Sequence, residues 1–255
     1  MADRPLMELT GVSKSFGAVQ ALTKVDFDVR AGEVMALVGD NGAGKSTLIK
    51  GVAGIYPFDE GSVFFEGQPV DIHGPRDAAD LGIEIVYQDL ALADNLDVVA
   101  NMFLGRERVQ SPWRLDETGM EEECIDTLTS LSVTTIRSVR QTVAELSGGQ
   151  RQAIAVAKAV MWNSRLVILD EPTAALGVAQ TRQVLDLVRR LADKGLGVVI
   201  ISHNLHDVFE VADRITVLRL GYRVSVLEAA QTTQQDVVHA ITAGKMESVP
   251  GMQEL

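Results

Sequence analysis

A glycine-rich stretch that begins at Gly39 has the spacing of a loop that binds phosphate groups. Four residues separate this glycine from Gly44, Lys45 and Ser46, as the P-loop pattern requires. The glycines let backbone N–H groups point at the phosphates, and a helix that begins near Ser46 adds its positive N-terminal end. We expect Lys45 to reach the β- and γ-phosphates and the hydroxyl of Ser46 to bind Mg²⁺. The residues expected to bind the nucleotide are Gly39, Asn41, Gly42, Ala43, Gly44, Lys45, Ser46 and Thr47.

Two adjacent acids, Asp170 and Glu171, follow the apolar run from Leu166 to Leu169. A carboxylate at the end of such a strand can help to hold Mg²⁺, which is the role that we expect of Asp170. Glu171 would polarise the attacking water as a general base. The alternative is two acids that merely face solvent at the end of a strand, and the P-loop favours the catalytic interpretation.

A second helix start that could meet an anion lies between the P-loop and the two acids. Ser147 and Gln150 have the spacing of a capping pair at the start of a helix. Gly148 and Gly149, which lie between them, leave the backbone N–H groups accessible to an anion. The alternative is a helix that is well capped and has no ligand.

The order of these motifs, with Leu-Ser-Gly-Gly-Gln at 146–150 between a P-loop and an acidic strand, resembles that of the ATPase subunits of ATP-binding cassette (ABC) transporters. The resemblance covers roughly residues 6–245 and implies that the chain binds ATP and Mg²⁺ and hydrolyses ATP. It further implies that Ser147, Gly148, Gly149 and Gln150 contact the γ-phosphate of ATP held by another copy. Because the sequence has one P-loop and one such motif, we expect two copies to sandwich two ATP molecules head to tail.

The same resemblance assigns roles to three further residues. Gln88, which follows the alternating run 83–87, matches the glutamine that contacts Mg²⁺ and the attacking water. His203 matches the switch histidine that contacts the γ-phosphate, so Gln88 and His203 join Glu171 as expected catalytic residues. Phe16 occupies the place of the aromatic residue that stacks on adenine, which needs only a flat ring face. The alternative for Phe16 is a core position in a β lobe.

Strand-like and helix-like segments alternate along most of the chain, which predicts an α/β fold. The runs 34–38, 166–169 and 198–201 are short and apolar, which is typical of strands covered by helices on both faces. Segments 25–29 and 63–68 have the pattern of antiparallel strands, and residues 90–160 are mostly helical in pattern. We predict an ABC ATPase core with a mostly parallel sheet, an antiparallel β lobe and an inserted helical lobe, within a domain at 6–245 followed by a short tail at 246–255.

The composition of the 255-residue chain is that of a globular protein, with 46% hydrophobic and 23% charged residues. A net charge of −12 argues against a broad surface for nucleic acid, because phosphate binding needs clustered Lys and Arg. No stretch approaches the roughly 18 apolar residues that span a bilayer, and the first residues lack the pattern of a secretory signal. We therefore expect a cytoplasmic protein without a nucleic-acid partner, and the resemblance implies a peripheral position on the inner face of the cell membrane.

Within the family, the resemblance is closest to bacterial importers of monosaccharides such as ribose, xylose and fructose, and it rests on the stretches 39–42, 101–107, 174–177 and 202–208. It implies membrane permease subunits as partners and, indirectly, a periplasmic or lipoprotein sugar-binding protein. One alternative is a soluble ABC ATPase that acts on DNA or ribosomes, but the stretch from Lys45 to Ser147 has no heptad run for a long coiled coil. Another is a P-loop kinase, which leaves the motif at 146–150 and His203 unexplained.

Two local features lead to further expectations. The family usually has an aspartate that helps communication between the two ATP sites at the position of Gly177, so we expect that coupling to differ here. The stretch from Leu96 to Leu104 is densely apolar, which suggests that the helical lobe near Gln88 and this stretch forms a groove for a cytoplasmic helix of the permease. The alternative for part of this stretch is the core of the lobe.

Overall fold

The computed structural model describes residues 4–111 and 113–244. The tail predicted at 246–255 lies outside the described residues. Within the described ranges, no helix combines the length and the apolar character needed to cross a membrane.

The central element is a six-stranded sheet in the order β12-β11-β3-β10-β9-β6. All neighbouring strands are parallel except β12, which pairs antiparallel with β11, so the prediction of a mostly parallel sheet is confirmed. The strands are β3 (Val34–Val38), β6 (Ile83–Val86), β9 (Leu166–Asp170), β10 (Gly197–Ile201), β11 (Arg214–Arg219) and β12 (Tyr222–Glu228).

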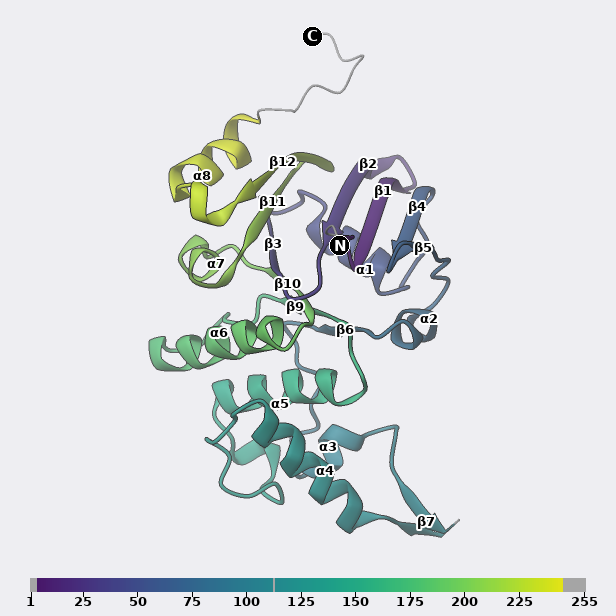
Figure 1. The fold of residues 1–255 in the computed structure, drawn as a ribbon, viewed down its shortest axis with the longest axis vertical. Helices are drawn as coiled ribbons and strands as arrows, with labels where there is room; N and C mark the ends of the chain where they lie inside the picture. The colour runs from purple at the N-terminus through teal and green to yellow at the C-terminus, as the bar shows by residue number, and fades with distance from the viewer. Residues whose placement is uncertain (1–3, 112, 245–255) are drawn as a thin grey trace.

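A second, antiparallel sheet forms the predicted β lobe in the order β2-β1-β4-β5. Its strands include both segments whose pattern indicated antiparallel pairing. Figure 1 shows this sheet beside the central one, close to the helix α1 that follows the glycine-rich loop. The strands are β1 (Met7–Phe16), β2 (Val19–Val29), β4 (Glu60–Phe65) and β5 (Gln68–Pro69), and the helices nearby are α1 (Lys45–Val52) and α2 (Pro75–Asp80).

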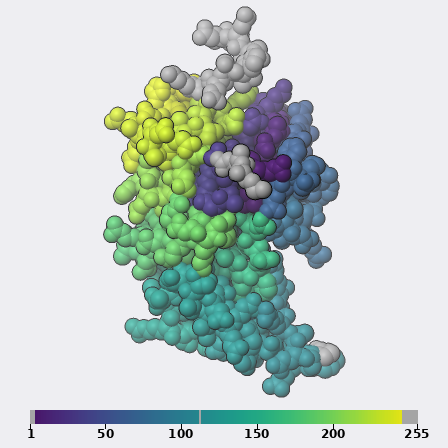
Figure 2. Space-filling model, in the orientation of Figure 1, coloured from purple at the N-terminus to yellow at the C-terminus, as the bar shows by residue number. Residues whose placement is uncertain are grey.

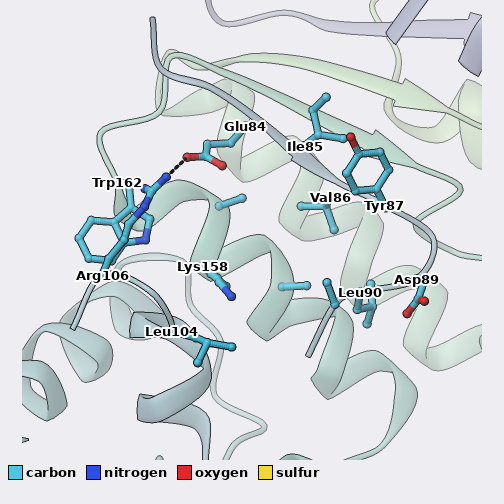
Figure 3. Close-up of a pocket in the computed structure, with 13 residues that line it drawn as sticks. Glu84, Ile85, Val86, Tyr87, Asp89, Leu90, Leu104, Arg106, Lys158 and Trp162 are labelled. Carbon is cyan, nitrogen blue, oxygen red and sulfur yellow. Dashed lines mark hydrogen bonds and ion pairs between the residues drawn. The ribbon is translucent and has the colours of Figure 1, made fainter. Parts of the chain in front are cut away.

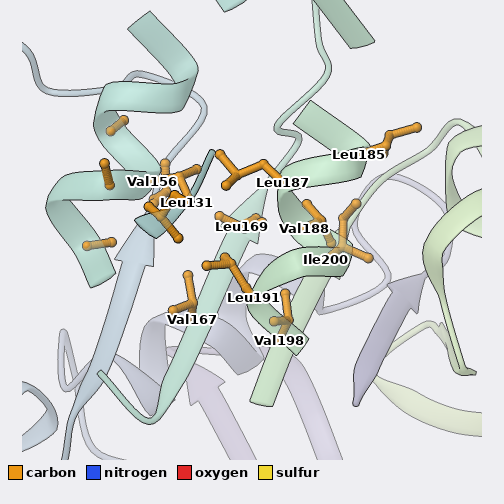
Figure 4. Packing of buried hydrophobic residues seen from close by; sticks show 14 of the residues in the cluster. Leu131, Val156, Val167, Leu169, Leu185, Leu187, Val188, Leu191, Val198 and Ile200 are labelled. Carbon is orange, nitrogen blue, oxygen red and sulfur yellow. The ribbon is translucent and has the colours of Figure 1, made fainter. Parts of the chain in front are cut away.

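Strand β3 explains why the central strands are wholly apolar, because its two faces belong to different cores. Val34, Ala36 and Val38 pack in the core that includes α6 (Val178–Asp193), whereas Met35 and Leu37 pack in the core shared with the antiparallel sheet. Alternation of side chains along a strand forces this division, so every position must be apolar. Figure 4 shows the first core, in which side chains of α6 cover those of β9 and β10.

The helical lobe lies between β6 and β9 in sequence. It contains α3 (Val98–Phe103), α4 (Glu117–Ser130), α5 (Gly148–Met161), the turn η1 (Val143–Glu145) and a small hairpin of β7 (Val109–Ser111) and β8 (Arg114–Leu115). In the space-filling view it forms the lower, teal part of the molecule (Figure 2). After β10, the chain adds α7 (Leu205–Val211), the turn η2 (Ala229–Gln231) and α8 (Gln234–Ala243), which packs against β11 and β12.

The apolar stretch from Leu96 to Leu104 only partly fits the expected groove. Val98, Val99, Met102 and Phe103 are at most 1% exposed and pack in the core of the lobe, so the groove prediction is wrong for them. Leu104, just after the helix, is 46% exposed. The physical reason is the helical spacing of the four buried residues, which places them on one side of α3 toward α4 and α5.

Asn101 is the fully buried polar residue of α3, and its side chain holds the loop that enters the helix. Its Oδ1 accepts a hydrogen bond from the N–H of Ala93 at 2.7 Å, and its Nδ2 donates to the carbonyls of Ala93 and Asp97, both at 3.0 Å. We expect Asn101→Ala to lower the free energy of unfolding by about 2–3 kcal/mol, because it removes the hydrogen bonds of a fully buried side chain and takes from the N–H of Ala93 its partner. Urea unfolding measures the loss, with the exposed Asn95→Ala as control. Equal urea midpoints for Asn101→Ala and Asn95→Ala would contradict a stabilising role of the Asn101 side chain.

Candidate active site

The glycine-rich loop connects the buried strand β3 to helix α1, as the P-loop pattern predicts. Two of its glycines cannot be replaced without a clash. A Cβ atom at Gly39 would overlap the carbonyl oxygen of Leu218, and one at Gly44, where φ is +105°, would lie 2.7 Å from Cδ2 of Leu22. The loop therefore keeps its backbone close to the neighbouring strands, with the N-terminal end of α1 directed at its hollow.

Lys45 is the first residue of α1 and folds back over the loop. Its Nζ donates to the carbonyl oxygens of Gly39 at 2.6 Å and Asp40 at 3.0 Å. Burial lowers the pKa of Lys45, and the nearby carboxylates of Glu171, Asp40 and Asp170 act in the opposite direction. A cation held over a glycine-rich loop at the start of a helix fits the phosphate groups of a nucleotide.

Asp170 is the last residue of β9 and lies in register with Ile201 of β10. Burial raises the pKa of Asp170, the carboxylate of Glu171 raises it further, and Lys45 lowers it. The predicted ligand set of Asp170, the Ser46 hydroxyl and the Gln88 amide offers oxygen atoms, which Mg²⁺ prefers. In the described parts of the chain, no three His, Cys, Asp or Glu side chains group to hold a metal, so an ion here would need those ligands and phosphate oxygens.

Glu171 has a left-handed backbone, with φ of +50°, which is rare outside glycine. Its N–H donates to the carbonyl oxygen of Ile201 at 2.9 Å, and its Oε2 lies 2.8 Å from Nδ1 of His203. The side chain of Glu171 is 17% exposed, whereas that of His203 is 76% exposed. The turn thus directs a largely buried carboxylate toward an accessible imidazole, and each of these two groups can exchange a proton with water.

One cavity of about 840 Å³ joins these groups. It brings together Gly39, Asp40 and Asn41 of the P-loop with Gln88, Glu171 and His203, which sequence analysis predicted to act together. Lys45, Ser46 and Asp170 are not among its lining residues. Helix α8 forms a further part of the wall, which no motif in the sequence indicated. The described residues that line the cavity are Val38, Gly39, Asp40, Asn41, Gln88, Glu171, Ala174, Ser202, His203, Leu205, Val238, Ile241 and Thr242.

Phe16 lies at the end of β1 and is 47% exposed, which rules out the alternative of a core position. Its ring contacts the ring of Tyr56 edge-on, with the centroids 5.1 Å apart. The ammonium of Lys14 lies 5.7 Å from the centroid of the Phe16 ring. Phe16 is outside the lining of the cavity, and stacking on adenine stays a prediction for its exposed ring.

The motif at 146–150 starts α5 as a capping box, as predicted. The hydroxyl of Ser147 accepts from the N–H of Gln150 at 3.4 Å, and Oε1 of Gln150 accepts from the N–H of Ser147 at 2.9 Å. None of Ser147–Gln150 is among the residues that line the cavity just described. The structure of one chain therefore does not bring this helix end to the P-loop. Gly177 caps α6 beside it, with its N–H donating to Oε1 of Gln180 at 3.3 Å.

A smaller cavity of about 250 Å³ lies between β6 and the helical lobe (Figure 3). Tyr87 and Asp89 line it, whereas Gln88 between them lines the larger cavity, so this short segment contacts both spaces. Leu104 and Trp162 form apolar parts of its wall. Besides Asp89, three more charged side chains line it, and they are Glu84, Arg106 and Lys158.

The charges in this smaller cavity are unevenly paired. Nη2 of Arg106 lies 3.4 Å from Oε1 of Glu84, and Cζ of the same guanidinium lies 5.1 Å from the centroid of the Trp162 ring. Burial lowers the pKa of Lys158, and nearby Arg106 lowers it further. In residues 4–111 and 113–244, no carboxylate lies within ion-pair distance of Lys158. The cavity therefore presents a half-buried cation between apolar walls.

Comparisons with known proteins identify the family of this chain. The sequence model of the ABC transporter family matches residues 22–174. The chain is 45% identical to the fructose import ATP-binding protein FrcA of Rhizobium meliloti, with 96% of each chain covered. It is 47% identical to the xylose/arabinose import ATP-binding protein XylG of Sulfolobus acidocaldarius, with 93% of this chain and 94% of that protein covered.

The fold agrees as well. A nucleotide-free ATP-binding cassette from an ABC transporter superposes with a TM-score of 0.81 at 26% identity, covering 95% of this chain and 97% of the other. The predicted fold of an ABC ATPase core with two lobes is thus confirmed. The sequence match spans the P-loop, the motif at 146–150 and the two acids. The chain therefore belongs to the ABC transporter family, as an ATP-binding domain.

Proposed function

We propose that this chain is the ATP-hydrolysing subunit of an ABC importer and drives uptake of a sugar through a membrane permease. The observation that carries the proposal is the single cavity in which the P-loop, Gln88, Glu171 and His203 meet. The sugar is inferred from the names of the relatives at 45% and 47% identity, which match nearly the whole chain. These relatives give no support to the alternative of an ATPase that acts on DNA or ribosomes.

Each residue of the proposed site has a separate task in binding or hydrolysing ATP. The loop at 39–47 and Lys45 hold the phosphates, while Ser46, Gln88 and Asp170 provide oxygen ligands for Mg²⁺. When bound, Mg²⁺ would neutralise charge on the phosphates. Glu171 orients the attacking water and accepts its proton, because it is the buried carboxylate that lines the cavity. His203, which contacts Glu171 in the free chain, turns to the γ-phosphate when ATP is bound.

A second copy of the chain completes the site. The P-loop and the helix end at Ser147–Gln150 both suit a phosphate, yet the cavity is lined only by the first of them. Two copies arranged head to tail would bring each helix end to the ATP of the other, which closes a symmetric dimer. Gly177 offers no carboxylate for communication between the two ATP sites, so backbone contacts of this loop would have to serve instead.

The smaller cavity is the proposed docking groove for the permease. Its apolar walls suit a short amphipathic helix, and the half-buried ammonium of Lys158 favours a helix that carries an acidic residue. Because Tyr87 and Asp89 line this groove while Gln88 lines the nucleotide cavity, docking and ATP can influence each other through one segment. Docking would place the subunit on the inner face of the cell membrane, with a periplasmic or lipoprotein sugar-binding protein acting through the permease.

Docking of the permease in this groove can be tested with substitutions at two leucines that are equally exposed. Leu104 in the groove and Leu115 on strand β8 are each 46% exposed, and Leu115 does not line the groove. We expect Leu104→Glu to reduce the permease-stimulated ATPase rate by about tenfold or more, because the new carboxylate is desolvated in the groove. ATPase activity of the isolated subunit should not change, and Leu115→Glu should behave like the unmodified chain.

The measurement uses the multi-spanning membrane protein that co-purifies with the tagged chain, reconstituted in vesicles with the sugar and its binding protein. Full stimulation of Leu104→Glu would contradict docking in this groove. Recovery of DNA or ribosomes in place of a membrane protein would contradict the importer itself.

A further inference from the structure

Helix α8 presents an apolar face to the nucleotide cavity. Three of its residues, which we call the α8 face, line the cavity together with the P-loop and His203. They are Val238 and, one helical turn later, Ile241 and Thr242. On an adjoining side of the helix, Val237 and Ala240 are buried against the sheet that carries β11 and β12. The helix is thus fixed to the sheet by one side, while Val238, Ile241 and Thr242 line the cavity.

The chemistry of the α8 face does not suit the phosphates of ATP. Val238 is 47% exposed, and it offers no charge or hydrogen bond. The hydroxyl of Thr242 already donates to the carbonyl oxygen of Val238 at 2.8 Å, so it has no free proton for a ligand. An apolar surface gains stability when another apolar surface covers it, which a phosphate cannot do.

The cavity has room for an occupant other than the nucleotide. Its volume of about 840 Å³ lies near the upper end of the roughly 300–1,000 Å³ that pockets for small ligands reach. The helix end at Ser147–Gln150, which the proposed function brings to the γ-phosphate, must enter this same space from a second copy. Whatever enters between the P-loop and His203 also passes the α8 face, because all three line one cavity.

We propose that the α8 face is a contact surface for the second copy of this chain, which covers it when two copies close over ATP. The inference rests on the proposed function, since it requires the ATP-bound dimer. It adds to that dimer a surface from a helix that lies beyond residues 22–174, the part matched by the family. Two-fold symmetry makes the contact occur twice, so a substitution on α8 changes two contacts in each dimer.

Chemical labelling tests the contact with a single thiol. Cys124 is the only cysteine, is fully buried and has a pKa raised to about 12 by burial, so it does not compete for a maleimide. Val238→Cys places an accessible thiol on the α8 face. Ala243→Cys is the matched control, because Ala243 is an exposed residue of the same helix that does not line the cavity. Both changes are made in a Glu171→Gln chain, which should retain ATP.

Alkylation rates are measured with saturating MgATP at protein concentrations below and above the midpoint of dimer formation, which light scattering determines. We expect alkylation of Val238→Cys to slow about tenfold or more only at the higher concentration, with no change for Ala243→Cys. Equal slowing at both concentrations would mean that the nucleotide covers the α8 face, and would overturn the inference. Unchanged alkylation while the dimer forms would overturn it as well. Absence of any dimer would instead refute the sandwich of the proposed function, and the inference with it.

Discussion

Replacing Glu171 with glutamine should lower the ATPase rate by roughly 10²- to 10⁴-fold, which is the contribution of a positioned general base. Glutamine keeps the size and the hydrogen-bonding oxygen of the side chain but cannot accept the proton of the attacking water. ATP should still bind, because the P-loop is untouched. Unhydrolysed ATP would then hold two copies together, so the variant should accumulate as an ATP-bound dimer.

Phosphate release measures the rate, and light scattering with MgATP measures the dimer. Glu145→Gln is the matched control, because it removes one exposed carboxylate close to the helix end at Ser147 without touching the cavity. A Glu171→Gln chain that hydrolyses ATP within threefold of the unmodified rate would assign the base to another residue. A purely monomeric Glu171→Gln chain, even with its permease reconstituted, would contradict the sandwich.

Replacing Lys45 with alanine should weaken MgATP binding by about 100-fold, because a hydrogen bond between charged groups contributes up to about 3 kcal/mol. The ammonium is half-buried and already lies over the loop, where it donates to the carbonyls of Gly39 and Asp40. Its loss removes a positive charge that faces the phosphates from within the loop. Isothermal titration calorimetry with MgATP measures the change.

Lys194→Ala serves as the control for this experiment. Lys194 is the exposed C-cap residue of α6 and lies outside the cavity, so its variant should bind MgATP as the unmodified chain does. Equal affinities for Lys45→Ala and the unmodified chain would refute the assignment of residues 39–47 as the phosphate site.

Much of the arrangement around the nucleotide cavity follows from the order of the strands. Gln88, Glu171 and His203 each come just after a buried run, and the P-loop follows another. Parallel strands place their carboxyl ends at one edge of the sheet, where ligands of such folds bind. The sequence therefore predicts that these residues meet, although it cannot give the distance of 2.8 Å between Glu171 and His203. Their individual roles remain predictions.

Features made by contacts between distant segments were beyond the sequence. The apolar positions of α8 look like those of any surface helix, and only packing on β11 and β12 turns Val238 toward the cavity. The docking groove is lined by Arg106, which follows α3, and by Lys158 of α5. These residues lie far apart in the sequence, so no local pattern predicts that they share a groove. The high density of apolar residues around Val98 and Phe103 suggested a docking surface, but both side chains are buried in the core of the lobe. A core and a docking surface have the same apolar composition, so the sequence alone does not distinguish them.

The position of β3 in its sheet has a consequence for how the protein is made. This strand, which leads into the P-loop, pairs only with β10 at Gly197–Ile201 and β11 at Arg214–Arg219. A ribosome synthesises the chain from the N-terminus, so the P-loop strand has neither of these neighbours until residues 197–219 have been made. Gly39 lies against Leu218, which belongs to the later of the two strands. A nascent chain thus cannot shape its phosphate site before β11 is made, and nucleotide binding begins only after that point.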